Sequence, residues 1–427
     1  MKINNYIQTS GICSKQSKIS NKLITLPDKH IEKKDKRDLL LTSNAYYNMQ
    51  NCILSFGLSK MYNAMNISKQ DRFKGCLLGG AIGDAFGAKI EWFSIDRIKN
   101  RYGASGLQYI PKTQGVYRVS DDTQMTLFTC EGLLKSFQNK GTIDEEPDYN
   151  SIYSSYKNWY NTQTKEKNDQ GEKSLLMKET SLYVKRGPGN TCMTSLKRGI
   201  PGSVDKPIND SMGNGGIMKT APIGLMYNKN PKLAFEIGVN IAALTHGHPN
   251  AYLPAGFLSS LIADLVNDVP LEKAIENSIE ILKTYKGHES TLSCVKKAIE
   301  CSVSNINDVD AIESIGYGGR GDEALGIALY SVLKYPNSFK KAITTAVNHS
   351  GDSDSTGAIA GNILGASMGI GAIPPAWAEK VEHADLLTIM SLGLDISGKK
   401  EENIENEQEY NSISERTDED VVVPVYK

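Results

Sequence analysis

Long hydrophobic runs are missing from this sequence of 427 residues, and no segment approaches the roughly 20 apolar residues that a membrane-spanning helix needs. The N-terminus lacks the continuous apolar stretch of a signal peptide. The seven cysteines are scattered, odd in number, and without the close pairs of a zinc site or a disulfide framework. Excess charge of one sign is also absent, because 48 Lys and Arg residues face 49 Asp and Glu residues. We therefore expect a cytoplasmic protein with neither a membrane nor a nucleic acid as partner.

Alternating patterns typical of β-strands are scarce, whereas apolar residues recur at three- and four-residue spacing along most of the chain. One example is the series Ala234, Ile237, Ile241 and Leu244. Such spacing places apolar side chains on one face of a helix. The sequence therefore predicts an all-α core, and we take residues 67–398 as one helical domain.

The two ends of the chain differ from this core. Residues 1–66 are rich in Lys, Asn and Ser with weak periodicity, and we interpret them as an N-terminal extension. Within it, residues 39–58 are apolar enough to dock on the core or on a partner, the alternative being an unstructured leader without a role. Residues 399–427 begin with a stretch rich in Glu and Asn, which predicts a flexible acidic tail.

Two of the expected helices contain glycine at every fourth position. The first series is Gly75, Gly79, Gly83 and Gly87, and the second is Gly357, Gly361, Gly365 and Gly369. Glycine inside a helix costs about 1 kcal/mol relative to alanine. These ridges without side chains therefore indicate the close approach of another helix or of a ligand.

Acidic residues gather at two expected helix starts near these ridges. One start contains Ser120, Asp121, Asp122 and Thr123; the other contains Asp352, Ser353, Asp354, Ser355 and Thr356; a further acid, Asp84, follows Gly83. A single Asp or Ser at a helix start is explained by capping. Two carboxylates at each start repel each other unless a cation neutralises them. Oxygen ligands of this kind suit Mg²⁺ or Mn²⁺ rather than zinc or copper.

Glycine loops and histidines give weaker signals. The loop Gly213–Gly216 and the segment 186–191 offer backbone N–H groups to an anion, although such loops are more often plain turns. His246 and His248 are two residues apart, without other ligands at zinc-site spacing, so only a ligand contact by His246 is plausible. His349 could orient the second aspartate group, or could be satisfied by the backbone at a helix end.

Six segments span nearly the whole helical core. They are GDAFGAKIE from Gly83, SDDTQMT from Ser120, NGGIMKTAPIG from Asn214, LTHGHPNA from Leu244, GYGGRGDEALGIALY from Gly316 and NHSGDSDSTGAIAGNILGA from Asn348. Together, and in this order, they resemble the ADP-ribosylglycohydrolases. This family includes the bacterial enzyme that reactivates dinitrogenase reductase and the vertebrate ADP-ribosyl-acceptor hydrolases.

The resemblance implies a compact orthogonal helical bundle with two Mg²⁺ ions, or Mn²⁺ in their place, at the bottom of a cleft that binds ADP-ribose. Carried over by position, the metal ligands would be Ser120, Asp121, Asp122, Asp352, Asp354 and Ser355. Glu91 would close over the scissile bond and act with Asp122 and Asp354 in catalysis. The substrate-binding residues would be Gly213, Asn214, Gly215, Gly216 and His246.

The activity implied is metal-dependent removal of ADP-ribose from a modified protein. We expect the arginine N-glycosidic linkage, because the SDDT and DSDS groups look closer to those of arginine-directed members. ADP-ribosyl-serine and O-acetyl-ADP-ribose are alternative substrates, and activation of the nucleophile by metal or by Glu91 is open. Two departures from the family stand out: Ser120 and Ser355 replace the Thr of many members, and GYGGRGDEA lacks the Trp that often follows its glycines.

A binding function is the rival from another class. Some bacterial members of the family act as immunity proteins, so residues 1–66 could contact a cognate ADP-ribosyltransferase toxin. We predict that deleting residues 1–66 leaves hydrolysis of a small ADP-ribosyl substrate intact and weakens partner binding, because the six motifs lie outside the extension. Loss of catalysis would make the extension part of the enzyme, and unchanged binding to every candidate transferase would leave it a passive leader.

Overall fold

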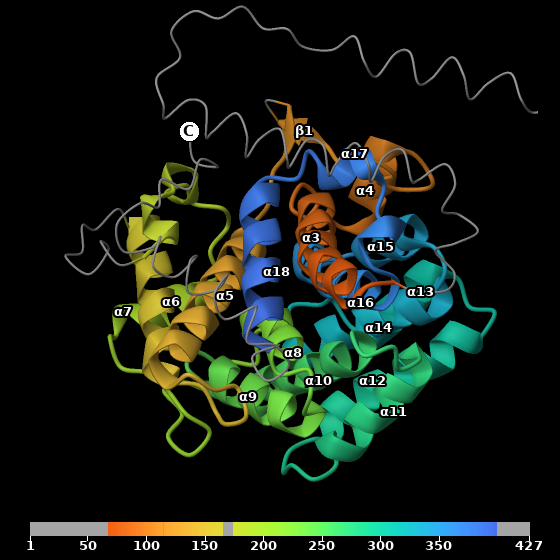
Figure 1. Ribbon diagram of the computed structural model, residues 1–427. Helices are drawn as coiled ribbons and strands as arrows, with labels where there is room; N and C mark the ends of the chain where they lie inside the picture. Colours follow the sequence, from red (N-terminus) through yellow and green to blue (C-terminus); the bar gives the residue numbers. More distant parts are fainter. Residues whose placement is uncertain (1–66, 114, 165–173, 399–427) are drawn as a thin grey trace, which may run out of the picture. The chain divides into compact units, whose positions relative to one another are not determined.

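Helices make up almost all regular structure in the computed structural model, which describes residues 67–113, 115–164 and 174–398 (Figure 1). Within these ranges the strands are confined to an antiparallel pair, β1 (Lys112–Thr113) and β2 (Val116–Tyr117). The all-α prediction is thus confirmed. The predictions for residues 1–66 and 399–427 lie outside the described residues. Across the described ranges, each helix is too short or too polar to cross a membrane.

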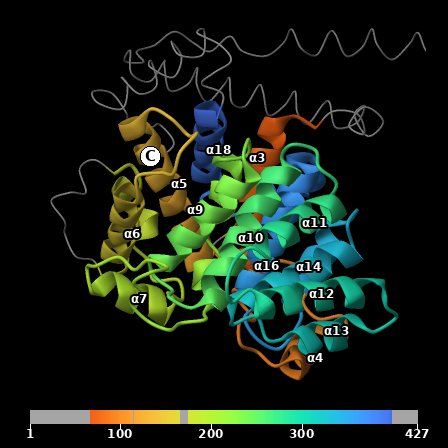
Figure 2. The ribbon, with the colours of Figure 1, turned by 90° about the horizontal axis from the view of Figure 1, so that it is seen from below.

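The helices form a bundle in which the residues of α3, α10 and α16 are almost all buried. In chain order the α-helices are α3 (Lys69–Gly87), α4 (Ile95–Tyr102), α5 (Asp121–Lys140), α6 (Tyr149–Thr164), α7 (Asn190–Lys197), α8 (Ala221–Met226), α9 (Pro231–Ala243), α10 (Pro249–Leu265), α11 (Leu271–Leu282), α12 (Glu289–Val303), α13 (Asp308–Ile315), α14 (Gly321–Lys334), α15 (Phe339–Val347), α16 (Ser353–Met368), α17 (Pro375–Ala378) and α18 (Ala384–Gly398). Short 3-10 turns are η3 (Leu176–Lys178), η4 (Thr180–Leu182), η5 (Asn214–Gly216) and η6 (Ile370–Ala372). Figure 2 shows α10 among α9, α11, α14 and α16, which it contacts.

The two glycine ridges pack against each other, which decides between the two interpretations of their spacing. A Cβ built on Gly75 would lie 2.5 Å from the carbonyl oxygen of Gly365. Gly79 faces Gly361 and Gly83 faces Gly357, with still shorter distances from the built Cβ to the facing carbonyl oxygen. The helices α3 and α16 therefore run antiparallel with their backbones in contact (Figure 1). Any side chain on either ridge would force the two helices apart.

This contact sets the position of the two helix ends that matter for the site. Gly87, at the C-terminal end of α3, lies against the backbone of Ser353 at the N-terminal end of α16. The chain then turns, and the N–H of Trp92 donates to the carbonyl of Gly351 at 2.7 Å. Glu91 is thereby held beside the first turn of α16.

Replacing a ridge glycine should destabilise the fold strongly. We predict that Gly361→Ala lowers the free energy of unfolding by at least about 2 kcal/mol, because the new methyl group would meet the Gly79 carbonyl oxygen well inside van der Waals contact. Gly371→Ala is the matched control, since nothing lies within 4 Å of a Cβ at that position. Its effect should stay within about 0.5 kcal/mol. Urea unfolding followed by circular dichroism measures both, and equal effects would contradict the ridge contact.

Candidate metal centre and active site

The first acidic group forms the N-terminal turn of α5. Ser120 is the N-cap, and its hydroxyl accepts from the Asp122 N–H at 3.2 Å. The carboxylate of Asp84, from α3, accepts from the N–H groups of Ser120 at 2.8 Å and of Thr123 at 3.1 Å. A side chain of α3 thus caps α5 and fixes the start of that helix relative to α16. The sequence placed Asp84 near the other acids but gave it no such role.

Asp121 points from the same turn toward a glycine segment. Its Oδ2 accepts from the Gly189 N–H at 3.1 Å, and its own N–H donates to the carbonyl of Arg186 at 3.0 Å. The segment 186–191 therefore borders the acidic residues. A Cβ on Gly187 would lie 3.8 Å from a carboxylate oxygen of Glu91, which places this segment on the Glu91 side of the site as well.

The second acidic group forms the N-terminal turn of α16. Asp352 is the N-cap residue, and its N–H donates to the carbonyl of Tyr317 at 2.9 Å. Oδ1 of Asp354 accepts from the N–H of Ser355 at 3.1 Å. His349 is buried, and its ring nitrogens bond the Ser350 carbonyl at 3.2 Å and the Thr356 hydroxyl at 3.0 Å. These bonds support the alternative in which His349 is satisfied locally rather than orienting the aspartates.

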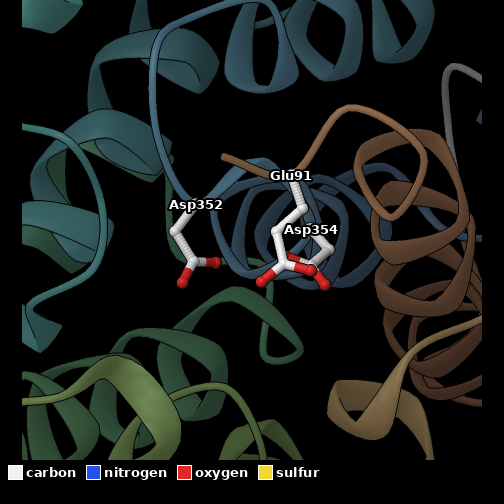
Figure 3. Close-up of side chains that lie close together, drawn as sticks. All are labelled: Glu91, Asp352 and Asp354. Carbon is white, nitrogen blue, oxygen red and sulfur yellow. The ribbon is translucent and has the colours of Figure 1, made fainter. Parts of the chain in front are cut away.

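Three carboxylates converge at the centre of the site. Glu91, Asp352 and Asp354 each place one oxygen so that all three atoms lie within 4.8 Å of one another. Figure 3 shows the carboxylates of Glu91 and Asp354 next to each other, with Asp352 to one side. The sequence-based assignment kept Glu91 apart from the ligands, whereas the structure groups it with two of them. Asp121 and Asp122 are outside this group of three.

The charges of the two acidic groups nevertheless act on each other. Burial raises the pKa of Asp122 well above its usual value, and the charges of Asp121, Asp84 and Asp352 raise it further. Burial and then the charges of Asp352, Asp122 and Glu91 do the same for the pKa of Asp354. The pKa of Glu91 rises to about 7, mainly through burial and next through Asp352. The starts of α5 and α16 therefore share one acidic site.

Two buried oxygens of this site have no hydrogen-bond partner in the part of the chain that the structure describes. They are Oδ2 of Asp122 and Oδ1 of Asp352, one from each helix start. A buried polar atom without a partner is costly, and a buried carboxylate more so. Capping therefore does not explain these side chains. A set of carboxylate and hydroxyl oxygens with unused lone pairs fits a hard divalent cation.

The glycine loop lies at another side of the acidic site. Asn214 donates through its backbone N–H to Gly319 at 3.1 Å and through its side chain to Gly318 at 2.8 Å. A Cβ built on Gly318 would in turn lie 3.2 Å from the carbonyl oxygen of Asp352. The loop and the second acidic group therefore both contact the Gly318–Gly319 segment.

His246 lies against this loop. Cβ atoms built on Gly213 and Gly215 would lie 3.5 and 3.0 Å from its Nε2. Its ring is buried, its Nδ1 bonds the Thr245 hydroxyl at 2.9 Å, and burial holds its pKa well below the usual value. The structure shows His246 supporting the loop, and its contact with a substrate stays a prediction.

Lys219 is a residue whose role the sequence did not indicate. It is fully buried, and its Nζ donates to the Gly215 carbonyl at 2.5 Å and to the Thr245 hydroxyl at 3.1 Å. Burial lowers the pKa of Lys219, and the nearby Cys192 and Asp121 partly oppose this decrease. Lys219 thus ties the glycine loop to the residue before His246. Its position in NGGIMKT, four residues after Gly215, was the signal available.

The comparisons with known proteins point to one family. A sequence model of the ADP-ribosylglycohydrolase family, described as "ADP-ribosylglycohydrolase", matches residues 65–404. The chain is 24% identical over 327 residues to an ADP-ribosyl-[dinitrogen reductase] glycohydrolase of Rhodospirillum rubrum, covering 74% of this chain and 92% of that protein. It is 27% identical over 319 residues to the ADP-ribosylarginine hydrolase Tri1 of Pseudomonas putida, covering 73% of this chain and 74% of that protein.

A solved structure shares the fold. The protein described as an ADP-ribosylglycohydrolase-related protein complex superposes with a TM-score of 0.56 at 23% identity, covering 78% of this chain and 99% of that one. The family match covers most of the chain, and the matched residues include both helix starts that form the acidic site. The chain therefore belongs to the ADP-ribosylglycohydrolase family, whose members are hydrolases that act on glycosidic bonds.

Proposed function

We propose that this protein removes ADP-ribose from modified arginine side chains of proteins by hydrolysing the N-glycosidic bond at C1 of the ribose. The observation that carries the proposal is the group of half-buried Glu91 with buried Asp352 and Asp354, next to a second pair of carboxylates. The arginine linkage is supported by the name of the Pseudomonas putida relative, an ADP-ribosylarginine hydrolase.

Two divalent cations, Mg²⁺ or Mn²⁺, complete the proposed site. Their ligands would be Ser120, Asp121, Asp122, Asp352, Asp354 and Ser355, which supply only oxygen atoms. The unpartnered oxygens of Asp122 and Asp352 support this assignment. When bound, such ions lower the pKa of a bound water and polarise the sugar hydroxyls.

The chain's own groups position the substrate and move the proton. The N–H groups of the Gly213–Gly216 loop would receive the diphosphate or ribose, with Lys219 and His246 holding the loop. Glu91 would take the proton of the attacking water as the water oxygen bonds to ribose C1 and the bond from C1 to the guanidine nitrogen breaks. The proton then passes to the leaving nitrogen, so that arginine and ADP-ribose are released with one water consumed.

The alternative substrates, ADP-ribosyl-serine and O-acetyl-ADP-ribose, present the same ribose C1 and would use the same acidic site. They differ from the arginine linkage only in the acceptor. The immunity-type function has no supporting observation in the described residues, because the segment assigned to it, residues 1–66, lies outside them. We do not propose it as the function.

The metal assignment predicts a specific loss in Asp354→Ala. Saturation of the wild-type protein with Mg²⁺ at about 100 times Kd should stabilise it by about 2.7 kcal/mol. The variant should lose this stabilisation, and its hydrolysis should fall more than about 100-fold, a change of ~2.7 kcal/mol in the barrier. Without metal, it should be no less stable than the wild type, because one buried like charge is gone.

Thermal unfolding with and without Mg²⁺, calorimetric titration and a release assay test this prediction. Asp205→Ala is the matched control, since Asp205 is exposed in a loop outside the acidic site. The control should behave like the wild type. Unchanged Mg²⁺ affinity and activity in Asp354→Ala would show that Asp354 is not a metal ligand.

The linkage prediction compares release rates on two substrates. Protein modified with ADP-ribose on arginine should be hydrolysed faster than protein modified on serine, and EDTA should stop both reactions because both need the same cations. A rate measured by mass spectrometry of released ADP-ribose suffices. Faster cleavage of the serine linkage would show that the arginine assignment is wrong while leaving the hydrolase assignment in place.

A further inference from the structure

An exposed tryptophan stands at the rim of the acidic site. Trp92 follows Glu91 directly, and 60% of its surface is exposed. Its backbone φ is 58°, a left-handed conformation that is uncommon for a bulky residue. The hydrogen bond from its N–H to Gly351 helps to hold this conformation. A strained, exposed aromatic residue beside a reactive group is a pattern found at functional sites.

Trp92 connects two parts of the site. Its backbone follows that of Glu91 directly, at the turn held by the hydrogen bond to Gly351. Its indole reaches the segment before α14, where Cη2 would lie 2.8 Å from a Cβ on Gly319. The carbonyl of Gly319 in turn accepts from Asn214 of the glycine loop. Because Gly319 has no side chain, there is room for the indole at this position.

A second exposed aromatic residue borders the same segment. Tyr317 is 55% exposed, and its carbonyl accepts from the N–H of Asp352 at 2.9 Å. Gly351 packs against the backbone of Tyr317 and accepts from Trp92. Both aromatic residues therefore contact the Gly351–Asp352 turn that opens α16. In the described residues, no Lys or Arg side chain stacks on either ring.

The negative charge of the acidic site favours binding of a cation at the rings of Trp92 and Tyr317. The π face of Trp or Tyr attracts a guanidinium, and partly desolvated pairs of this kind contribute about 1 to 2 kcal/mol. Glu91 directly precedes Trp92, and the N–H of Asp352 donates to the carbonyl of Tyr317, so the group of Glu91, Asp352 and Asp354 adds a negative field near both aromatic residues. A serine side chain offers neither a positive charge nor a planar group to such a rim.

We propose that Trp92 and Tyr317 form the acceptor subsite, which binds the guanidinium of the modified arginine while the ribose occupies the acidic site. This inference rests on the proposed function, since it names the group that lies beyond ribose C1. Trp92 is adjacent to Glu91, the residue assigned to the reacting water, which places the rim at the scissile bond rather than at the diphosphate. Stacking of the adenine ring is the competing use of the same surface.

The test separates acceptor binding from ADP-ribose binding. ADP-ribosyl-arginine serves as substrate and free ADP-ribose, which lacks the acceptor, as competitive inhibitor. In Trp92→Ala, KM for the substrate should rise about three- to thirtyfold. The inhibition constant of ADP-ribose should change less than twofold. Trp92→Phe keeps a ring without the indole N–H and should stay within threefold of the wild-type KM.

Two further variants guard against a folding defect or an indirect effect. Gly319→Ala should displace the indole without removing it, because the new methyl group meets Cη2, and should raise KM in the same direction. Tyr109→Ala is the control, since Tyr109 is 61% exposed and its ring packs edge-on against Tyr102. Melting temperatures of all variants, measured in parallel, identify any that do not fold.

Three results would overturn the inference. Equal losses for ADP-ribosyl-arginine and ADP-ribose would assign the rim to adenine. A fall in kcat that is the same in Trp92→Ala and Trp92→Phe, with KM unchanged, would leave Trp92 only orienting Glu91. An unchanged KM in both Trp92→Ala and Gly319→Ala would show that the rim does not bind the acceptor. If the wild-type protein releases no arginine at all, the proposed function fails instead, which is a distinct outcome.

Discussion

The backbone contact between α3 and α16 is the constraint on which the rest of the site depends. Because Gly79 and Gly361 carry no side chains, the two helices approach closely enough that Gly87 touches Ser353. That register puts Glu91 beside the first turn of α16 and lets Asp84 reach across to cap α5. Three helix ends are thus positioned by one packing interface. The helical propensity lost at the glycines is offset by the contact they allow.

The same geometry creates an electrostatic problem that packing cannot solve. Carboxylates of Asp122, Asp352 and Asp354 are buried at two helix starts. Burial raises the pKa of each, and the charges of neighbouring carboxylates raise the pKa of Asp122 and of Asp354 further. The positive ends of α5 and α16 and a few N–H donors reduce this cost but leave oxygens without partners. The site is therefore built at the expense of stability, which is the usual sign of residues kept for binding or catalysis rather than for the fold.

Much of the architecture could be predicted from local pattern, and the missing part is tertiary. The spacing of apolar residues predicted helices, and two Asp-rich starts predicted an oxygen-ligand site; both follow from periodicity and charge that a single segment carries. The spacing of the glycines did not reveal that Gly79 would face Gly361, since a ridge does not identify its partner. The cap that Asp84 provides and the hydrogen bonds of buried Lys219 could not be predicted for the same reason. Each depends on a residue distant in sequence.

The proposed metal ligands and the proposed acceptor subsite differ in how firmly the fold holds them. The aspartates lie at the starts of α5 and α16, whose positions are fixed by buried contacts with α3. Trp92 and Tyr317 instead lie on turns at the rim and are largely exposed. A substitution at the rim alters few buried contacts. If the two proposals hold, substitutions at the rim would change the acceptor that is recognised and leave the hydrolysis at ribose C1 constant.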